Sequence, residues 1–375
     1  MAASGVALSL TAPLEVLFIR DRSRSSLYIG LFMLVSGLGV VAVDVFGTRF
    51  VPRLDARAAL AAGLSVFGVA CIGLGVAPDG GLLMSSRLLQ GFGGGMMLGA
   101  GLQAAVRVRP AAEDPAHALG RFNAAFLFGG AVGSPGGLLV AGLVAGRAGY
   151  LIAFVVTGAL ALVIAAVLAT ALPRLAAPAG PPGPRIGLPR FAKVPASGAA
   201  LVLAMSGEFL RGGVLLTALP LAGAARAYST ITISLAIALM SGVEIAVLTV
   251  AYRIIARVGV VAVLVASFAL GALCAALLAI TDGAATYLAV SLLFGVSLAG
   301  ATASLPVLVV AQVGDSAAGL AKFRISAGAG ILAGSFGCSV LGASIGPAAL
   351  FSLIALTLLG SLQLACFVGR RMATA

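Results

Sequence analysis

The chain has 375 residues, of which 61% are hydrophobic and only 9% charged, and its formal net charge is +12. Soluble domains are about half apolar and about a quarter charged, and a folded chain always leaves part of its apolar surface exposed. The composition therefore excludes an ordinary soluble domain and indicates a protein embedded in a lipid bilayer.

The positive charge does not indicate a nucleic-acid partner. Basic residues occur singly or in pairs between long apolar runs, and the basic clusters with interleaved aromatic residues that mark nucleic-acid binding are absent. The only histidine is His117, and the four cysteines lie in apolar stretches without the spacing of metal ligands. We expect no nucleic acid, metal ion or cofactor.

The hydropathy pattern predicts an all-α membrane protein with twelve transmembrane helices. A helix that crosses the bilayer needs about 20 predominantly apolar residues. The predicted segments are 5–19, 26–47, 58–77, 82–106, 120–144, 149–172, 198–222, 229–251, 258–280, 284–311, 319–343 and 347–369. The first is short for a complete span. Either it crosses with a tilt while its flanking polar side chains reach to the membrane surface, or the natural chain begins upstream.

The charges between these segments indicate an orientation. If the N-terminus is cytoplasmic, most of the 23 Lys and Arg residues fall in cytoplasmic loops, which is the usual bias. We therefore expect a multi-pass protein of the cell inner (plasma) membrane with both termini in the cytoplasm.

The segment 173–197 is rich in proline and basic residues. Proline removes backbone donors and opposes helix, so we predict a cytoplasmic linker here. It separates an N-terminal six-helix bundle, residues 1–172, from a C-terminal six-helix bundle, residues 198–375.

The two predicted bundles carry similar short motifs in the same order, which indicates two parallel repeats. The clearest pairs are Thr11-Ala-Pro-Leu with Thr217-Ala-Leu-Pro-Leu, Leu88-Leu-Gln-Gly91 with Leu292-Leu-Phe-Gly295, and Gly130-x-x-Gly133 with Gly334-x-x-Gly337.

The predicted helix 82–106 contains Arg87-Leu-Leu-Gln90-Gly91, followed by three more glycines. An arginine inside a span is costly and normally faces the bundle interior or water, whereas glycines let a second helix approach closely. Alternatively, the Arg87 side chain reaches out to the membrane interface. The motif resembles the helix-4 motif of the major facilitator superfamily. The resemblance implies the fold of that superfamily and a role for Arg87 and Gln90 in proton coupling or substrate binding.

The predicted helix 120–144 contains Gly133-Ser-Pro135-Gly136-Gly137. A proline among glycines bends a helix and permits close, sliding contact with a partner helix. The stretch is similar to the helix-5 motif of the superfamily's exporters, which implies antiport, although here the glycine pair follows the proline directly. The alternative is ordinary packing of small residues. We expect Gly91, Gly133, Pro135, Gly137 and Gly295 to act in helix packing and gating.

The loop between the second and third predicted helices holds Arg53 and Arg57. It occupies the place of the superfamily's charged cytoplasmic latch, from which it departs at Pro52 and Asp55. Asp44, one turn before the loop, would then supply the missing carboxylate, or would pair with an arginine at the surface.

Four further ionisable residues lie inside predicted spans, where each costs about 2–3 kcal/mol unless it is paired or hydrated. Glu208 and Arg211 are three positions apart and can pair directly. Glu15 and Glu244 have no charged neighbour in the sequence, so we expect them in a water-filled cavity, where they could face each other. Carboxyl groups in such a site suit proton transfer, and interhelical structural hydrogen bonds are the alternative.

These features predict a secondary transporter and not an enzyme, because the chain has no GxxxxGK[ST] loop for ATP. We expect a monomer that exports a small hydrophobic compound, such as a drug or secondary metabolite, in exchange for protons by alternating access of residues 1–172 and 198–375. Its partners would be that solute, protons and the lipid bilayer. The alternatives are proton symport or efflux of a polar metabolite such as a sugar, and an intramembrane enzyme.

Overall fold

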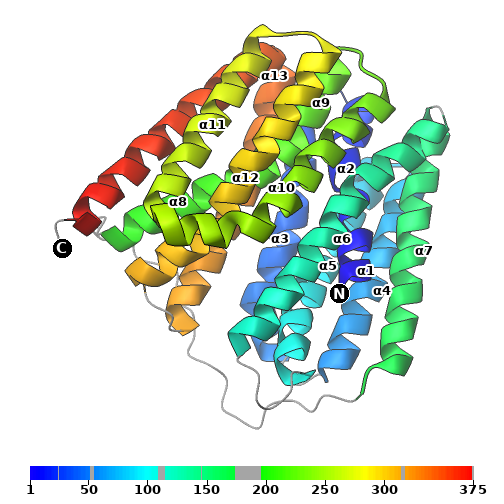
Figure 1. Ribbon diagram of the computed structural model, residues 1–375. Coiled ribbons are helices and arrows are strands. Elements are labelled where there is room, and N and C mark those ends of the chain that lie inside the picture. Colours follow the sequence, from blue (N-terminus) through cyan, green and yellow to red (C-terminus); the bar gives the residue numbers. More distant parts are fainter. Residues whose placement is uncertain are drawn as a thin grey trace. The chain divides into compact units, whose positions relative to one another are not determined.

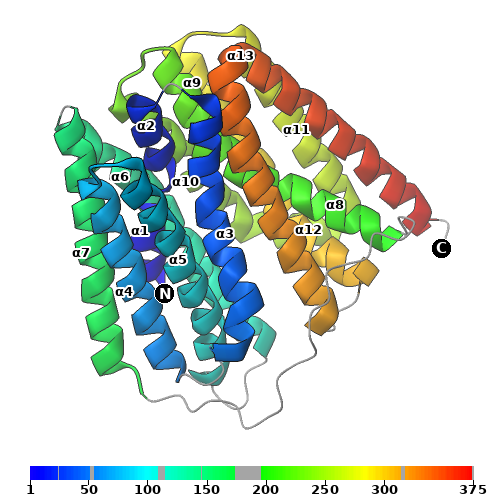
Figure 2. The ribbon, with the colours of Figure 1, turned by 180° about the vertical axis from the view of Figure 1, so that it is seen from behind.

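The computed structural model describes residues 1–23, 25–50, 55–108, 115–144, 146–173, 196–313 and 317–373. These residues form helices joined by short turns, and no strand occurs among them (Figures 1 and 2). The elements are α1 (Ala2–Ser9), α2 (Ala12–Arg22), α3 (Ser26–Phe50), α4 (Ala56–Val76), α5 (Gly80–Val108), α6 (Pro115–Leu143), α7 (Arg147–Ala171), α8 (Ala196–Phe209), the π-helix η2 (Leu210–Ala218), α9 (Leu219–Ala225), α10 (Thr230–Val258), α11 (Val260–Ile280), α12 (Ala284–Val313) and α13 (Ala317–Ala373).

The described helices account for the twelve predicted spans. Ten helical stretches among the described residues are long and apolar enough to cross a membrane. One of them, Ile325–Met372, turns at Gly346 and contains two spans. The twelfth span is α5, in which Arg87, Gln90 and a run of glycines lower the mean hydropathy. The chain is therefore an all-α, multi-pass membrane protein, as predicted.

The chain divides into two compact units. The first comprises Met1–Ile19 and Leu31–Pro184, and the second comprises Arg20–Gly30 and Arg185–Ala375. Residues 174–195 of the predicted linker lie outside the described residues.

The same packing scheme recurs in each unit. In the first unit, α4 packs against α5 and α7, and α1 packs against α6. In the second unit, α11 packs in the same way against α12 and α13, and α8 with η2 packs against α13. These three pairings of spans in the first unit therefore have counterparts in the second unit, as expected of the two repeats predicted from the short motifs.

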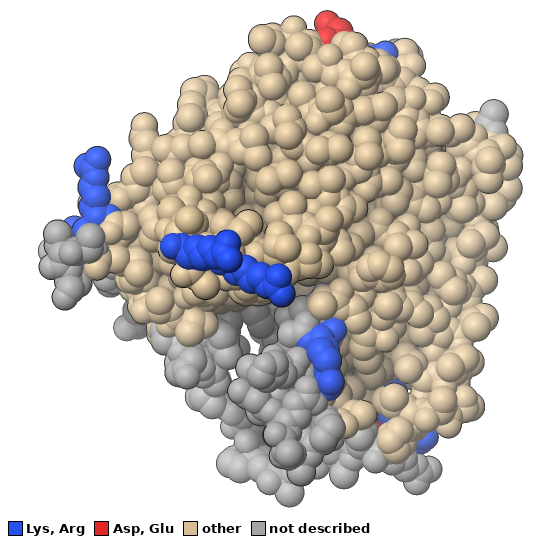
Figure 3. Space-filling view, viewed as in Figure 1, with Lys and Arg blue, Asp and Glu red and all other residues tan. Residues whose placement is uncertain are grey.

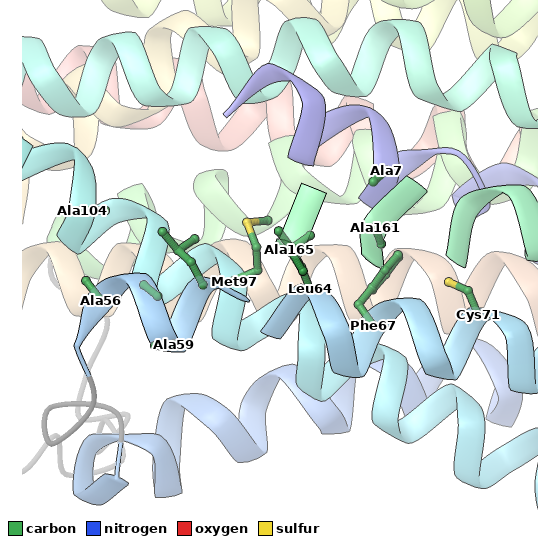
Figure 4. Close-up of a cluster of buried hydrophobic side chains, with 12 residues drawn as sticks. Ala7, Ala56, Ala59, Leu64, Phe67, Cys71, Met97, Ala104, Ala161 and Ala165 are labelled. Carbon is green, nitrogen blue, oxygen red and sulfur yellow. The ribbon is translucent and has the colours of Figure 1, made fainter. Parts of the chain in front are cut away.

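The core of the first unit is built largely from alanines. Figure 4 shows Ala59, Leu64 and Phe67 of α4 beside Met97 of α5 and Ala161 of α7. Helices in lipid gain little from the hydrophobic effect and are held by close packing, which small side chains permit. Alanine side chains therefore form much of the contact surface between the helices of this unit.

The first and seventh spans both depart from a regular α-helix near a proline. The first span breaks after Ser9 and restarts as α2, which carries Pro13 in its first turn. The seventh passes from α8 through η2 into α9, which carries Pro220 in its first turn. Proline lacks an N–H and is tolerated at the start of an α-helix, so α2 and α9 each begin just before it. The paired Thr11 and Thr217 motifs of the sequence mark these two positions.

Few charged residues lie on the described surface of the face drawn in Figure 3. The face in Figure 3 is uncharged over most of its area, with Lys and Arg in a few separate groups and very little Asp or Glu. Large apolar side chains such as Leu143 and Ile280 are 79% exposed. A surface of this kind is suited to lipid rather than to water.

Candidate functional site

The first unit contains a buried ion pair between two spans. Arg87 of α5 lies 2.5 Å (Nη1 to Oε2) from Glu15 of α2. Arg87 is 5% exposed and Glu15 is 3% exposed. The Arg87 side chain therefore turns into the bundle and does not reach out to the membrane interface.

Gln90 completes this pair from the same face of α5. Its side-chain oxygen accepts a hydrogen bond from Arg87, and its nitrogen donates to Oε1 of Glu15 at 2.6 Å and to Oγ1 of Thr11 at 3.1 Å. Thr11 in turn donates to Oε1 of Glu15 at 2.8 Å. Both Glu15 oxygens are therefore bound, and Thr11 at the interruption of the first span is part of the site.

Arg87 also contacts the second span. Its Nε donates to the backbone oxygen of Phe32 at 3.2 Å, and its guanidinium lies 5.0 Å from the centre of the Phe32 ring. These contacts of the Arg87 guanidinium lower the free-energy cost of burying the ion pair. The cluster of Thr11, Glu15, Arg87 and Gln90, called here the first-unit cluster, is electrically neutral and joins α2, α3 and α5.

The second unit contains a different ionic cluster. Arg211 of η2 binds Glu244 of α10 through two hydrogen bonds, Nη2 to Oε1 at 2.5 Å and Nη1 to Oε2 at 3.4 Å. Thr302 of α12 accepts from Arg211 Nη2 at 3.2 Å and donates to Glu244 Oε1 at 3.3 Å. Guanidinium and carboxylate match well in such a bidentate pair.

Glu208 of α8 is the second carboxylate at this arginine. Its Oε2 lies 3.6 Å from Arg211 Nε, and its side chain is 24% exposed, compared with 5% for Glu244. The spacing of three residues does bring Glu208 and Arg211 together, but the closer partner of Arg211 comes from another span. The second-unit cluster, Glu208, Arg211, Glu244 and Thr302, thus has two carboxylates for one arginine.

The structure differs from the expectation that Glu15 and Glu244 stand in a water-filled cavity. Both side chains are buried, and each is bound by an arginine of its own unit. Arg87 is 72 positions from Glu15 and Arg211 is 33 positions from Glu244, so the spacing within one helix cannot reveal either pair.

The π-helix η2 holds Arg211 in position. The carbonyl of Gly212 accepts hydrogen bonds from Thr217 Oγ1 at 2.9 Å and from Ser335 Oγ of α13 at 3.1 Å. Long π-helical stretches are rare, and π-bulges often mark functional sites. The pattern of apolar and polar residues in the sequence does not indicate a π-helix. The adjacent glycines, Gly212 and Gly213, permit close contact with α13.

The predicted gating glycines lie against the backbones of other helices. A side chain added at Gly91 of α5 would collide with the backbone of Ser36 in α3, and one added at Gly295 of α12 would collide with the backbone of Met240 in α10. The contacts are equivalent in the two units, since Gly91 and Gly295 occupy the same place in their motifs.

Helix α6, which is the fifth span, packs on the first span through glycines at every fourth position. Gly129, Gly133 and Gly137 of α6 lie against the backbone of α1 and of Leu10, which follows it. Pro135 lies inside the helix between the last two of them. In the second unit Gly330 and Gly334 of α13 lie against α8 and η2 in the same way, whereas Gly337 has nothing within 4 Å. Of the two paired motifs, Gly133 in the first unit and Gly334 in the second therefore lie against the backbone of another helix.

The predicted cytoplasmic latch is described only in part. Arg53 lies outside the described residues, as does the side chain of Asp44 on α3. Arg57 donates through Nη1 to the backbone oxygen of Leu172 at 3.2 Å and lies 3.8 Å (Nε to Oδ2) from Asp55, which caps α4. Asp55 is therefore a carboxylate partner of Arg57 that the sequence interpretation missed.

The Major Facilitator Superfamily model matches residues 1–337. The chain belongs to the Major Facilitator Superfamily. Since the superfamily and its fold are those of transporters rather than of enzymes, the chain has a general transporter role with a small-molecule substrate. No curated protein matches the chain.

Two solved structures illustrate the superfamily fold. The crystal structure of a mutant of the nucleoside transporter NupG is 12% identical, with a TM-score of 0.69 over 98% of each chain. An inward-facing, unoccupied bacterial homolog of the human lysosomal transporter Spinster is 11% identical, with a TM-score of 0.68 over 98% of this chain and 92% of the other. At these identities the likeness concerns the fold alone.

Proposed function

We propose that this superfamily member is a proton-coupled secondary transporter that exports a small hydrophobic compound, and that the second-unit cluster carries the proton. The observation that carries the proposal is the charge of that cluster. Among the described residues of the second unit, Glu208 and Glu244 share the single arginine Arg211. A net negative charge inside a span is costly, and one bound proton cancels it.

Glu208 is the carboxylate to which we assign the proton. Its contact with Arg211 is 3.6 Å long, and its side chain is more exposed than that of Glu244. Glu244 has the bidentate bond to Arg211 and the hydroxyl of Thr302, which favour its charged form. Loss of the proton from Glu208 would restore the competition of two carboxylates for Arg211 and bias the transport cycle.

We assign a positioning role to the first-unit cluster. Glu15 and Arg87 cancel each other's charge, and Gln90 and Thr11 satisfy the remaining carboxylate oxygen. Because both carboxylate oxygens of Glu15 are bound within the cluster, we assign the transported proton to the second unit instead. The cluster fixes α5 against the interrupted first span, which the transport cycle must move as one body.

The direction and the substrate class rest on the helix contacts and on the composition. The glycines of α6 that border Pro135 lie against the first span, in keeping with the resemblance to the exporters' motif. The chain has no tryptophan and only five tyrosines, whereas sugar sites usually stack their ligands on such rings. A cavity lined mainly by Leu, Val, Phe and Met side chains would suit a hydrophobic solute.

The charge pattern indicates the orientation of the chain in the membrane. We place the protein in the cell inner membrane as a monomer, with both termini in the cytoplasm, because this orientation puts most basic residues inside. An ion gradient is the energy source, since the chain has no phosphate-binding loop for ATP. Alternating access would then come from movement of the N-terminal half against the C-terminal half.

The test is transport by the purified protein in proteoliposomes with an imposed pH gradient. The probes are two hydrophobic dyes, ethidium and Hoechst 33342, and two polar solutes, uridine and lactose. We expect dye movement opposite to the proton flow, and its collapse when a protonophore removes the gradient. Movement of uridine or lactose in the direction of the protons, without any dye transport, would overturn the proposal in favour of symport of a polar metabolite.

A further inference from the structure

The seventh span contains a long π-helix directly before a proline. The π-helix η2 covers nine residues, and the N–H of Leu219 after it bonds to the oxygen of Val214, five residues back. Such helices are rare, and because their bonds close on the fifth residue instead of the fourth, η2 holds one extra residue. In a regular α-helix the ring of Pro220 would collide with the carbonyl of Leu216, four residues before it. Each form of this stretch therefore carries a cost that the other avoids.

Both ends of the seventh span are held by neighbouring helices. Before η2, α8 packs against α12 and α13. After η2, the hydroxyl of Tyr287 on α12 donates to the backbone oxygen of Leu219 at 2.9 Å. Arg226, which follows α9, donates to Asp282 between α11 and α12 at 2.9 Å. The extra residue can therefore leave η2 only by moving along the helix, and each residue that it passes shifts by one place, a turn of about 100°.

Two hydroxyl groups can serve the seventh span both before and after such a movement. Thr217 and Ser335 donate to the carbonyl of Gly212, at 2.9 and 3.1 Å. The Thr217 bond reaches five residues back, whereas Thr157 bonds to the carbonyl four residues before it, as is usual in an α-helix. If the extra residue moved toward α8, the carbonyl of Gly213 would replace that of Gly212 and become this usual partner. Both hydroxyls would therefore keep a partner.

The glycine pair beside Arg211 also allows the movement. A Cβ added at Gly212 would lie 2.5 Å from the backbone oxygen of Ile331 in α13, so only glycine fits this place. The next residue, Gly213, is a glycine as well. Gly213 could therefore enter the place of Gly212, while Gly212 would enter that of Arg211. The guanidinium group would then turn by about 100° and leave Glu244.

We propose that η2 is the moving part of the seventh span and that Gly213 is a positioning residue for it. During transport the extra residue moves toward α8, Gly213 takes the place of Gly212, and Arg211 turns away from Glu244. This inference rests on the proposed proton coupling in the second-unit cluster and adds the movement that follows it. Glu208 and Glu244 both attract Arg211 in the structure. A proton on Glu208 removes one of these attractions and so favours the movement.

Gly213→Ala tests the proposal because its methyl group fits the present place of Gly213 but not that of Gly212. At Gly213 the added Cβ meets Cys338 Sγ at 3.0 Å and Gly334 Cα at 3.1 Å, which small shifts can relieve. At the place of Gly212 it would meet the backbone of Ile331, which cannot move aside. The variant should therefore keep the fold and the present arrangement but block the movement.

Hydrogen exchange measured by mass spectrometry and dye efflux from proteoliposomes are the two readouts. We expect the amide hydrogens of η2 to exchange about tenfold more slowly in Gly213→Ala than in wild type, because the movement no longer opens their bonds. Proton-driven efflux should fall to the passive level. The control Gly75→Ala adds a methyl group with an equally close contact in the first unit, 3.1 Å from Phe154, and should match wild type in both. Equal or faster exchange in Gly213→Ala would overturn the proposal, since simple damage to packing speeds exchange.

Glu208→Gln gives an independent test if Gly213→Ala does not fold. It removes one of the charges that hold Arg211 and leaves every glycine unchanged. The amide hydrogens of η2 should then exchange about fivefold faster than in wild type, and unchanged exchange would contradict the proposal. A wild-type protein that moves no dye would instead refute the proposed export, while hydrogen exchange would still decide whether η2 moves.

Discussion

Arg211 binds Glu244 through both terminal guanidinium nitrogens, with Nη2 to Oε1 at 2.5 Å and Nη1 to Oε2 at 3.4 Å. This leaves only Nε, at 3.6 Å, for Glu208. The second-unit cluster therefore has one strongly bound carboxylate and one weakly bound carboxylate. The first-unit cluster has one carboxylate and one arginine. This difference is the reason why the proton is assigned to the second-unit cluster and a positioning role to the first-unit cluster.

Glu208→Gln removes the surplus charge and leaves the Arg211–Glu244 pair intact. We expect proton-driven dye efflux from proteoliposomes to fall to the passive level and to lose its pH dependence, because the carboxyl group to which the proton is assigned is gone. Exchange of dye against dye, which needs no net proton movement, should continue. The matched control Glu208→Asp keeps the carboxylate and should retain pH-dependent efflux. Normal proton-driven efflux by Glu208→Gln would contradict the assignment.

Arg211→Gln leaves two carboxylates in the span without a cation. Removal of one partner from a buried ion pair costs about 3–5 kcal/mol, so this variant should unfold at a lower denaturant concentration or temperature than wild type. The double variant Arg211→Gln/Glu244→Gln should recover most of this loss. Unfolding followed by circular dichroism measures both effects. A double variant no more stable than the single variant would show that the pair contributes little to stability.

Gln90→Leu tests whether the first-unit cluster depends on its amide. The substitution removes the hydrogen bonds from Gln90 to Glu15 and Thr11 and leaves buried polar atoms unsatisfied. We expect a loss of about 1–3 kcal/mol in the free energy of unfolding. The control Gln363→Leu changes an exposed glutamine of α13 and should be nearly neutral. Equal stability of the two variants would exclude a positioning role for Gln90.

The sequence predicted the twelve spans because hydrocarbon imposes a length and a composition on each one. It also located Arg87, Gln90 and the glycine contacts, since charges and small residues stand out in an apolar chain. The pairing of Glu15 with Arg87 and of Glu244 with Arg211 was not predictable, because it depends on which faces of two distant helices meet. The same holds for Thr302, whose importance comes from its place between Arg211 and Glu244. The π-helix that presents Arg211 has no signature among the patterns of apolar and polar residues.

Gly91→Ala should disturb the contact between α5 and α3. The added methyl group meets the backbone of Ser36, which cannot move aside as a flexible side chain can. Overpacking of this kind costs about 1–3 kcal/mol. The matched control on the same helix is Gly99→Ala, where nothing lies within 4 Å. The thermal midpoint of the purified variants compares the two, and an equal midpoint for both would show that the close approach at Gly91 is not required.

Gly346→Ala should strain the kink in α13. Gly346 has φ 80° and ψ 170°, a conformation that residues other than glycine rarely adopt. The expected cost is about 1–3 kcal/mol, with a lower yield of folded protein and a lower thermal midpoint. Gly360→Ala, in the helical part of α13 with nothing within 4 Å, is the control and should behave as wild type.

The central claim, that a carboxyl group of the second-unit cluster binds a proton, is tested most directly by infrared difference spectroscopy of the purified protein during a pH titration. We predict that the wild-type protein shows the C=O stretching band of a protonated carboxylic acid. This band should disappear in Glu208→Gln and persist in Glu15→Gln. A band that is unchanged in Glu208→Gln and lost in Glu15→Gln would contradict the claim and assign the proton to the first-unit cluster.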